Sequence, residues 1–294
     1  MKKYRVVHTS KYSFMREVSY CQGQVRLTPR VFHGQELTFS QIVFRPLASN
    51  ERRQQDPFGN LVSHFEISRP LMSLSISAIN TVTVDVQAAT ALSFDDSIPW
   101  DSLSRHYPER SVETIADIQR YTESSPLIEI QPMFSDYAQA CFTPGVPLLV
   151  AVKKLIHQIH HEFSYDNSAS HVGTTATQAL QMRKGVCQDF SHAAIACLRS
   201  KGIAARYVTG YVARTPSLSK QEPQIASALS HAWFSVFEPD IGWVDFDPTN
   251  NSCIDENYIT VSWGRDYSDV APLTGNVAEE NQHTMQVSID IESL

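Results

Sequence analysis

The chain has 294 residues, of which 42% are hydrophobic and 19% charged, and its formal net charge is -7 at pH 7. This composition predicts a globular protein with a sizeable core, and the length favours two domains. A negative chain without a concentrated run of Lys and Arg argues against a nucleic-acid partner. We find no stretch typical of a membrane span or a secretory signal, so we expect a cytoplasmic protein without membrane contacts.

The first part of the chain, residues 1–87, alternates apolar and polar residues in the manner of β-strands, as in 62–67 and 74–78. Residues 56–60 (DPFGN) form a turn between two such strands. We expect an all-β N-terminal domain similar to a sandwich. In residues 88–147, the prolines at 99, 108, 126, 132 and 144 interrupt short helical stretches, which predicts a partly helical connector.

Residues 148–264 predict a core of helices and strands. A helix is expected over 150–163, a second from Cys187 to Gly202, a strand over 205–212, and a hairpin from His231 to Asp247. Residues 215–230 are expected to form a mobile loop. Residues 265–294 read as a tail whose last strand, 285–291, returns to the N-terminal sheet. The predicted fold class is α+β, in which the helix that carries Cys187 packs on an antiparallel sheet.

Cys187 lies where a helix is expected to begin, after a glycine that can make the necessary turn. An unperturbed thiol, with a pKa near ~8.5, is mostly protonated at neutral pH, so a nucleophilic cysteine needs a stabilised thiolate. The unpaired N–H groups of a first helical turn stabilise such an anion and also the oxyanion of a tetrahedral intermediate. Arg183 and Lys184 add positive charge nearby or simply form a solvated turn.

His231 and two carboxylates lie on the predicted hairpin. The turn near Pro239 brings the beginning of its first strand and the end of its second strand together, so His231 can meet an aspartate there. That carboxylate would fix the imidazole tautomer so that the other ring nitrogen faces a thiol. Asp245 and Asp247 share a strand face, and both remain candidates from the spacing. Pro248 ends the ladder, which favours an exposed rim position for Asp247.

Four segments together resemble the signature segments of the transglutaminase-like superfamily, whose core is papain-like: 185–190 (GVCQDF), 206–211 (RYVTGY), 231–233 (HAW) and 247–249 (DPT). The resemblance implies a catalytic triad of Cys187, His231 and Asp247, and it decides against Asp245. Many members carry Glu where this chain has Ser235. Gln35 and the segments 25–30, 56–60 and 264–273 are similar to the bacterial transglutaminase-like proteins that are often described as cysteine proteases.

The resemblance implies an acyl-transfer enzyme that acts through a thioester on a peptide or protein substrate. We expect hydrolysis, as in a peptidase or amidase, because the subgroup points that way and no calcium-loop pattern is visible. Transamidation, as in a protein-glutamine transglutaminase, uses the same catalytic parts and is the alternative. A non-catalytic peptide-binding protein on this scaffold is the alternative of another class, and it would be expected to lack a triad residue.

Several further residues have structural interpretations. His192 points away from the thiol on a helix and is expected to be structural, and Gln188 and Asp189 are expected to cap or adjoin that helix. Tyr165 is a weak candidate for an oxyanion donor. His157 and His161 have a spacing that can bind metal, but the zinc motif lacks its Glu and a third ligand. The cysteines, five in number and widely spaced, indicate no disulfide frame and a reducing compartment: Cys21, Cys141, Cys187, Cys197 and Cys253. We therefore expect no metal and no cofactor.

Overall fold

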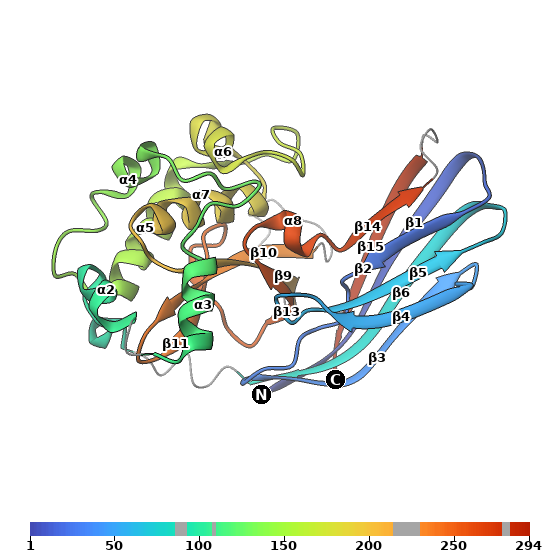
Figure 1. Ribbon diagram of the computed structural model, residues 1–294, viewed down its shortest axis with the longest axis horizontal. Helices are drawn as coiled ribbons and strands as arrows, with labels where there is room; N and C mark the ends of the chain where they lie inside the picture. Colours follow the sequence, from blue (N-terminus) through green and yellow to red (C-terminus); the bar gives the residue numbers. More distant parts are fainter. Residues whose placement is uncertain (86–92, 108–109, 214–229, 278–282) are drawn as a thin grey trace, which may run out of the picture.

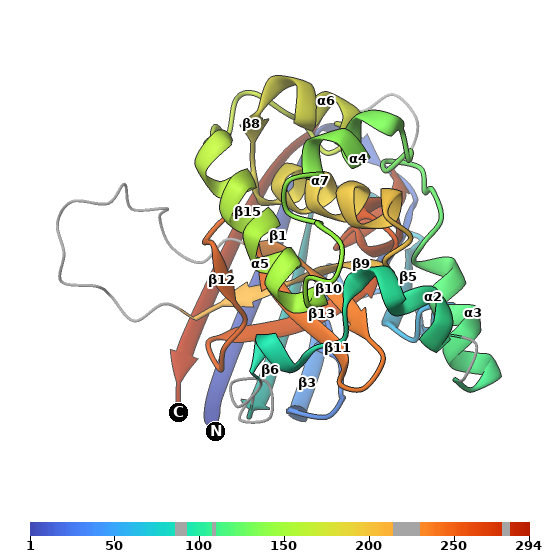
Figure 2. The same ribbon diagram turned by 90° about the vertical axis from the view of Figure 1, so that its left-hand side faces the viewer.

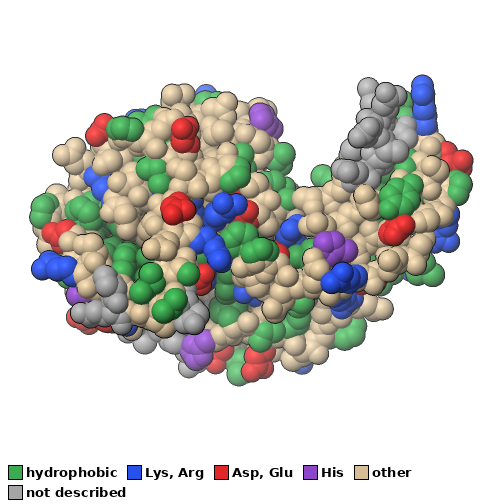
Figure 3. All heavy atoms as spheres, viewed as in Figure 1, with side chains coloured by type: hydrophobic (Ala, Val, Ile, Leu, Met, Phe, Trp, Pro, Cys, Tyr) green, Lys and Arg blue, Asp and Glu red, His purple; other side chains and the backbone are tan. Residues whose placement is uncertain are grey.

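The computed structural model describes residues 1–85, 93–107, 110–213, 230–277 and 283–294. The chain forms a lobe of long β-strands and a second lobe in which helices cover a sheet (Figure 1). A notch separates the two lobes on the face that Figure 3 shows, and acidic and basic side chains are interspersed there. The predicted α+β class is confirmed. The loop predicted over 215–230 lies outside the described residues except for its last residue.

The β-lobe is a sandwich of two four-stranded sheets, with the strand orders β15-β1-β6-β3 and β14-β2-β5-β4. In β6 every second residue from Leu74 to Val84 is buried, which is the alternation of a strand with one face on a core. Side chains of both sheets, such as Ile76 and Phe65, form one apolar cluster. The bounds are β1 (Lys2–Val18), β2 (Cys21–Val25), β3 (Gln35–Arg45), β4 (Asn50–Gln55), β5 (Leu61–Ile67) and β6 (Leu71–Val84).

The end of the chain completes both sheets of this lobe. β15 (His283–Ser293) pairs antiparallel with β1, which is the place predicted for the last strand. β14 (Leu273–Val277) pairs with β2 in the opposite sheet, and the sequence analysis missed this strand. The first and last strands of the described structure, β1 and β15, are therefore neighbours in one sheet of the N-terminal domain.

Short helices connect the two lobes and wrap the helical one (Figure 2). They are two 3-10 turns, η1 (Phe94–Asp96) and η2 (Trp100–Ser102), and the helices α2 (Leu103–His106), α3 (Val112–Arg120) and α4 (Pro132–Ala138). Pro132 occupies the first turn of α4, a position where its missing N–H costs nothing. The connector contributes Leu103, Ile128 and Phe134 to the main core.

The helical lobe is built on a five-stranded antiparallel sheet with the order β12-β11-β10-β9-β13. Helix α7 packs on β9 and β10 and is itself contacted by α4, α5 and α6. The bounds are α5 (Leu148–Glu162), β7 (Ser164–Tyr165), α6 (Ala176–Met182), β8 (Lys184–Gly185), α7 (Cys187–Ser200), β9 (Ala205–Val212), β10 (Ser230–Glu238), β11 (Gly242–Asp247), β12 (Ser252–Cys253), β13 (Tyr258–Gly264) and α8 (Tyr267–Val270).

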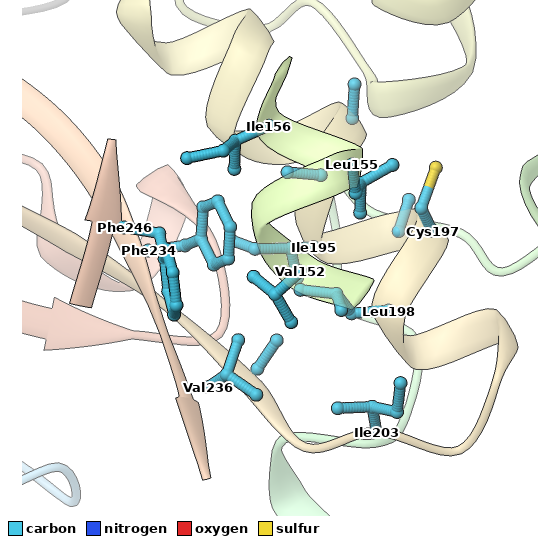
Figure 4. Packing of buried hydrophobic residues seen from close by; sticks show 14 of the residues in the cluster. Val152, Leu155, Ile156, Ile195, Cys197, Leu198, Ile203, Phe234, Val236 and Phe246 are labelled. Atoms are coloured by element: carbon cyan, nitrogen blue, oxygen red, sulfur yellow. The ribbon is translucent and has the colours of Figure 1, made fainter. Parts of the chain in front are cut away.

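The core of this lobe lies between α5, α7 and the sheet. Figure 4 shows Val152 of α5 and Ile195 of α7 packed toward Phe234 of β10 and Phe246 of β11. α7 is buried along nearly its whole length, so its position is fixed by packing on several sides. A fully packed helix of this kind holds its first residue at a defined place above the sheet. None of the helices in the described ranges combines the length and apolar character needed to cross a membrane.

Candidate active site

Cys187 is the first residue of α7, and it is partly exposed whereas most of the helix is buried. Gly185 has φ +152, and a Cβ at that position would collide with the Asp189 carboxylate. That carboxylate accepts a hydrogen bond from the Val186 N–H at 2.7 Å and another from the Ser170 hydroxyl. Asp189 therefore caps the helix that carries the thiol, and it does so from within the first turn.

His231 lies at the beginning of β10, and Asp247 is the last residue of β11. The antiparallel register of the hairpin brings these two ends together. Nε2 of His231 lies 2.7 Å from Oδ2 of Asp247, and Cys187 lies close enough to raise the pKa of His231 as well. The structure thus brings together the three residues that the sequence analysis selected; their catalytic role stays a prediction.

Asp247 is fully buried, so the predicted exposed position is wrong. Pro248 does end the ladder, but the following turn folds back over the carboxylate. Oδ1 accepts hydrogen bonds from the backbone N–H groups of Thr249 at 2.9 Å and Asn250 at 3.1 Å. Oδ2 accepts from the Tyr258 hydroxyl at 2.9 Å and from the Asn250 amide as well as from His231.

The charges of this pair support each other. Burial disfavours the imidazolium, but Asp247 and Cys187 raise the pKa of His231 to about 10. Burial likewise disfavours the carboxylate, but the charge of His231 and the hydrogen bonds from His231, Asn250 and Tyr258 lower the pKa of Asp247 below its ordinary value. At neutral pH the pair is therefore an imidazolium next to a carboxylate.

Asp245 belongs to a different set of contacts. Its carboxylate accepts hydrogen bonds from the Ser235 hydroxyl and from the Trp233 indole. Arg206 donates from Nε to the same Ser235 hydroxyl at 3.2 Å, and its guanidinium lies over the rings of Trp243 and Trp263. The carboxylate opposite Ser235 is therefore engaged in a buried polar network, and none of the hydrogen bonds described for it joins His231.

The remaining candidates have varied settings. His192 is fully buried and its Nε2 accepts from the Tyr267 N–H at 3.2 Å, as expected of a structural residue. Tyr165 pairs with Gly185 in the short β7–β8 ladder and is 38% exposed. Burial and, next, the interaction with Cys187 raise the pKa of Tyr165 to about 12. Arg183 forms an ion pair with Glu162.

The histidines at the end of α5 make hydrogen bonds of their own. His161 donates to the His157 carbonyl at 2.9 Å, and His157 accepts from Asn251. His160 donates to the Thr249 carbonyl at 2.9 Å and so fixes the turn that follows Asp247. Within the ranges that the structure describes, no group of three or more His, Cys, Asp or Glu side chains is arranged to hold a metal ion.

Three residues of the site were missed from the sequence: Asn250, Tyr258 and His160. Asn250 could have been found, because an Asp followed by Pro and two polar residues is a common turn in which backbone N–H groups return to the carboxylate. Tyr258 and His160 come from other elements, and no local pattern connects them with Asp247.

Two family models match the chain. One describes the bacterial transglutaminase-like N-terminal region and covers residues 4–83, and the other describes the transglutaminase-like superfamily and covers residues 136–248. The "Uncharacterized protein Rv2569c" of Mycobacterium tuberculosis is 32% identical over 295 residues, which is 98% of this chain and 92% of the relative. The chain belongs to the transglutaminase-like superfamily.

The fold has a solved counterpart. The crystal structure of "a Putative Cysteine Protease from Cytophaga hutchinsonii" superposes with a TM-score of 0.75 at 18% identity, covering 100% of this chain and 91% of the other. A "Protein-glutamine gamma-glutamyltransferase" of Pseudomonas aeruginosa is 29% identical over 101 residues, which is 33% of this chain and 15% of the relative. The Cytophaga hutchinsonii structure shows the fold alone, and the family assignment rests on the two family models and on the Mycobacterium tuberculosis relative.

Proposed function

We propose that this transglutaminase-like protein is a cysteine-nucleophile acyl-transfer enzyme that acts on peptide or carboxamide bonds. The observation that carries the proposal is that His231 is hydrogen-bonded to the buried Asp247 carboxylate and lies close enough to Cys187 for the two side chains to interact electrostatically. A nucleophile, a base and a group that orients the base are the parts that such a reaction requires. Family membership supports the same conclusion.

In the first half of the proposed reaction, the Cys187 sulfur attacks the carbonyl carbon and the carbonyl electrons move to oxygen. The tetrahedral intermediate then collapses, the C–N bond breaks, and the imidazolium of His231 gives its proton to the departing amine. The acyl group remains on sulfur as a thioester. Asp247 keeps the imidazole oriented through Nε2, so that the other ring nitrogen serves the thiol and the leaving group.

The beginning of α7 supplies the groups that would stabilise the oxyanion. The backbone N–H groups of Cys187 and Gln188 lie in the first helical turn, where no intrahelical carbonyl can accept from them. Two such donors next to the sulfur would bind the developing charge, and one donor is typically worth roughly 2.7–4 kcal/mol of barrier. The Gln188 side chain is directed elsewhere, because its amide donates to the Val172 carbonyl at 3.1 Å.

We infer that water resolves the thioester, which makes the enzyme a peptidase or amidase. His231 would take a proton from the water, the acid product would leave, and the Cys187 thiolate would be restored. The description of the Cytophaga hutchinsonii structure as a cysteine protease favours hydrolysis. The partial likeness to a protein-glutamine gamma-glutamyltransferase favours transfer to an amine, which is the second candidate. A cytoplasmic location and a peptide or protein substrate remain part of this proposal.

A peptide library incubated with and without an added primary amine would test the proposal. Mass spectrometry distinguishes cleavage, deamidation of Gln and attachment of the amine. We expect cleavage or deamidation that the amine does not divert, and we expect none of these products with Cys187→Ala. If the amine-labelled peptide is the main product, the reaction is transamidation and the proposal of hydrolysis is wrong. If Cys187→Ala forms the same products, the reaction does not proceed through a thioester on this residue.

A further inference from the structure

β13 is the edge strand of the sheet in the helical lobe, and the N-terminal domain occupies its free edge. On one side β13 pairs with β9. On the other side, two side-chain amides bind its backbone in the way a neighbouring strand would. The Gln35 amide donates to the Thr260 carbonyl at 2.7 Å and accepts from the Thr260 N–H at 2.8 Å. The Asn60 amide binds Trp263 in the same manner, at 2.9 and 3.0 Å.

Both amides are fully or almost fully buried, with exposed fractions of 1% for Gln35 and 0% for Asn60. They lie on either side of an irregularity in the β13 ladder, between Thr260 and Ser262. A buried backbone group without a partner is costly, so these amides fix the place of a strand that is irregular at this point. Figure 1 shows β13 between β9 and the ends of the N-terminal strands.

Apolar contacts support the same junction. Tyr4 and Val82 of the N-terminal domain pack with Tyr211, Ile259 and Val261 of the core sheet in one buried cluster. The turn that precedes β13 is held as well, because Lys2 donates from Nζ to the Asn257 side chain at 2.9 Å. The next residue in the chain is Tyr258.

Tyr258 connects this junction with the candidate active site. Its hydroxyl donates to Oδ2 of Asp247 at 2.9 Å, and its ring lies 6.2 Å from that of His231. A second connection runs across the sheet, since Thr260 lies opposite Gly210 and Gly210 lies opposite His231. Thr260, which Gln35 binds, therefore lies in the same row of the sheet as His231 and two positions after Tyr258.

We propose that Gln35 and Tyr258 are positioning residues, through which the N-terminal β-domain holds Asp247 in the orientation that His231 requires. The inference rests on the proposed function, because it assigns to one domain the task of orienting the triad of the other. The titratable groups described next to His231 are Asp247 from β11, Cys187 from α7 and Tyr258 from β13, and the Asn250 amide and the Trp233 ring also face it. Loss of either positioning residue would let the carboxylate turn from the imidazolium, which would then be held less firmly next to the Cys187 sulfur.

The test is the rate at which iodoacetamide alkylates Cys187 in the full-length protein between pH 5.5 and 10, followed by peptide mass spectrometry. Near pH 6 a free thiol is almost wholly protonated, so fast alkylation there would identify a sulfur that its neighbours activate. We expect Gln35→Ala and Tyr258→Phe to lower the Cys187 rate at pH 6 about tenfold, which is what one lost hydrogen bond implies. Near pH 10 both should approach the native rate.

Asn80→Ala is the matched control. Asn80 is a fully buried amide of the same domain, but it donates to the Leu27 carbonyl within that domain. It should keep the native pH profile even if it lowers stability. The double variant of Gln35 and Tyr258 should lose less than the product of the two single effects, because both residues act on Asp247. Loss of fold would be recognised by fast labelling of the buried Cys141 and Cys197.

The outcomes separate this inference from the function on which it depends. If native Cys187 reacts at pH 6 no faster than the partly exposed Cys253, the activated thiolate is absent and the proposed function fails. If native Cys187 is fast and both Gln35→Ala and Tyr258→Phe keep the native profile or react faster, the positioning role is overturned while the function stands.

Discussion

Nε2 of His231 lies 2.7 Å from Oδ2 of Asp247, and the carboxylate is fully buried whereas the imidazole is 16% exposed. The buried Asp247 carboxylate accepts five hydrogen bonds, two of them from backbone N–H groups. The exposed edge of the imidazole is left for the thiol and the substrate. This asymmetry is what a fixed orienting group and an accessible base require.

The two aspartates of the hairpin should therefore differ in function. Asp247→Asn should lower the turnover number by roughly 10³–10⁴-fold, because an amide can hold the imidazole in the wrong tautomer. Asp245→Asn should leave turnover nearly unchanged but cost about 1–3 kcal/mol of unfolding free energy, because an amide has one acceptor oxygen for the two donors Ser235 and Trp233 and carries no charge to pair with Arg206. Steady-state kinetics and urea unfolding of both variants measure the two effects. Equal losses of turnover would refute the assignment.

The raised pKa of His231 has a consequence for stability. Its ordinary value is 6.5 and its value in the fold is about 10. A raised pKa contributes stability that is fully present below 6.5 and is lost as the pH rises through 10. We therefore expect the difference in unfolding free energy between the native protein and His231→Gln to be largest near pH 6 and to shrink toward pH 10.

Asp247 determines how the unfolding free energy changes at acid pH. Since its pKa is lowered in the fold, its contribution is present above its ordinary value of 3.8 and disappears as the pH falls through the lower value in the fold. Urea titrations at pH 6, 8 and 10 therefore measure the range in which the unfolding free energy changes with pH because of His231 and not because of Asp247. A difference that grows with pH would show that the imidazole is neutral in the native state.

Gly185 should be necessary for the geometry of the nucleophile. In Gly185→Ala the new Cβ meets the Asp189 carboxylate that caps α7, and the residue must also adopt φ +152. We expect a loss of about 1–3 kcal/mol in unfolding free energy together with slower alkylation of Cys187. Gly202→Ala is the control at the other end of the same helix: its φ is +73, but nothing lies within 4 Å of the added Cβ. Gly202→Ala should lower the unfolding free energy but leave the alkylation rate of Cys187 unchanged. Equally slow alkylation in both variants would contradict a specific role of Gly185.

The local elements could be predicted from the sequence because the signals that define them are local. The strand over Ala205–Val212 and the helix that begins at Cys187 follow from residue pattern and from Gly185, and the structure has them at those bounds. The hairpin register then brings His231 to Asp247. The choice between Asp245 and Asp247 needed the family resemblance, because both share a strand face.

The contacts that complete the site could not be predicted in this way. Tyr258 reaches Asp247 from another strand, and Gln35 binds Thr260 although 225 positions separate them. The first contact depends on the order of strands within one sheet and the second on how the two lobes dock, and alternation and turn residues encode neither. The burial of Asp247 was misjudged for a related reason: the position of Pro248 predicts the end of a strand, but not the direction of the turn that follows.

The central claim is that Cys187 carries an acyl group, and the formation of an acetyl-enzyme from p-nitrophenyl acetate tests it most directly. The sulfur would take the acetyl group while p-nitrophenolate leaves. The account predicts a burst of about one equivalent of p-nitrophenolate per chain, with the acetyl group on Cys187 by peptide mass spectrometry, and no burst with Cys187→Ala or His231→Ala. The absence of a burst in the native protein, or acetylation of Cys253 as fast as that of Cys187, would contradict it.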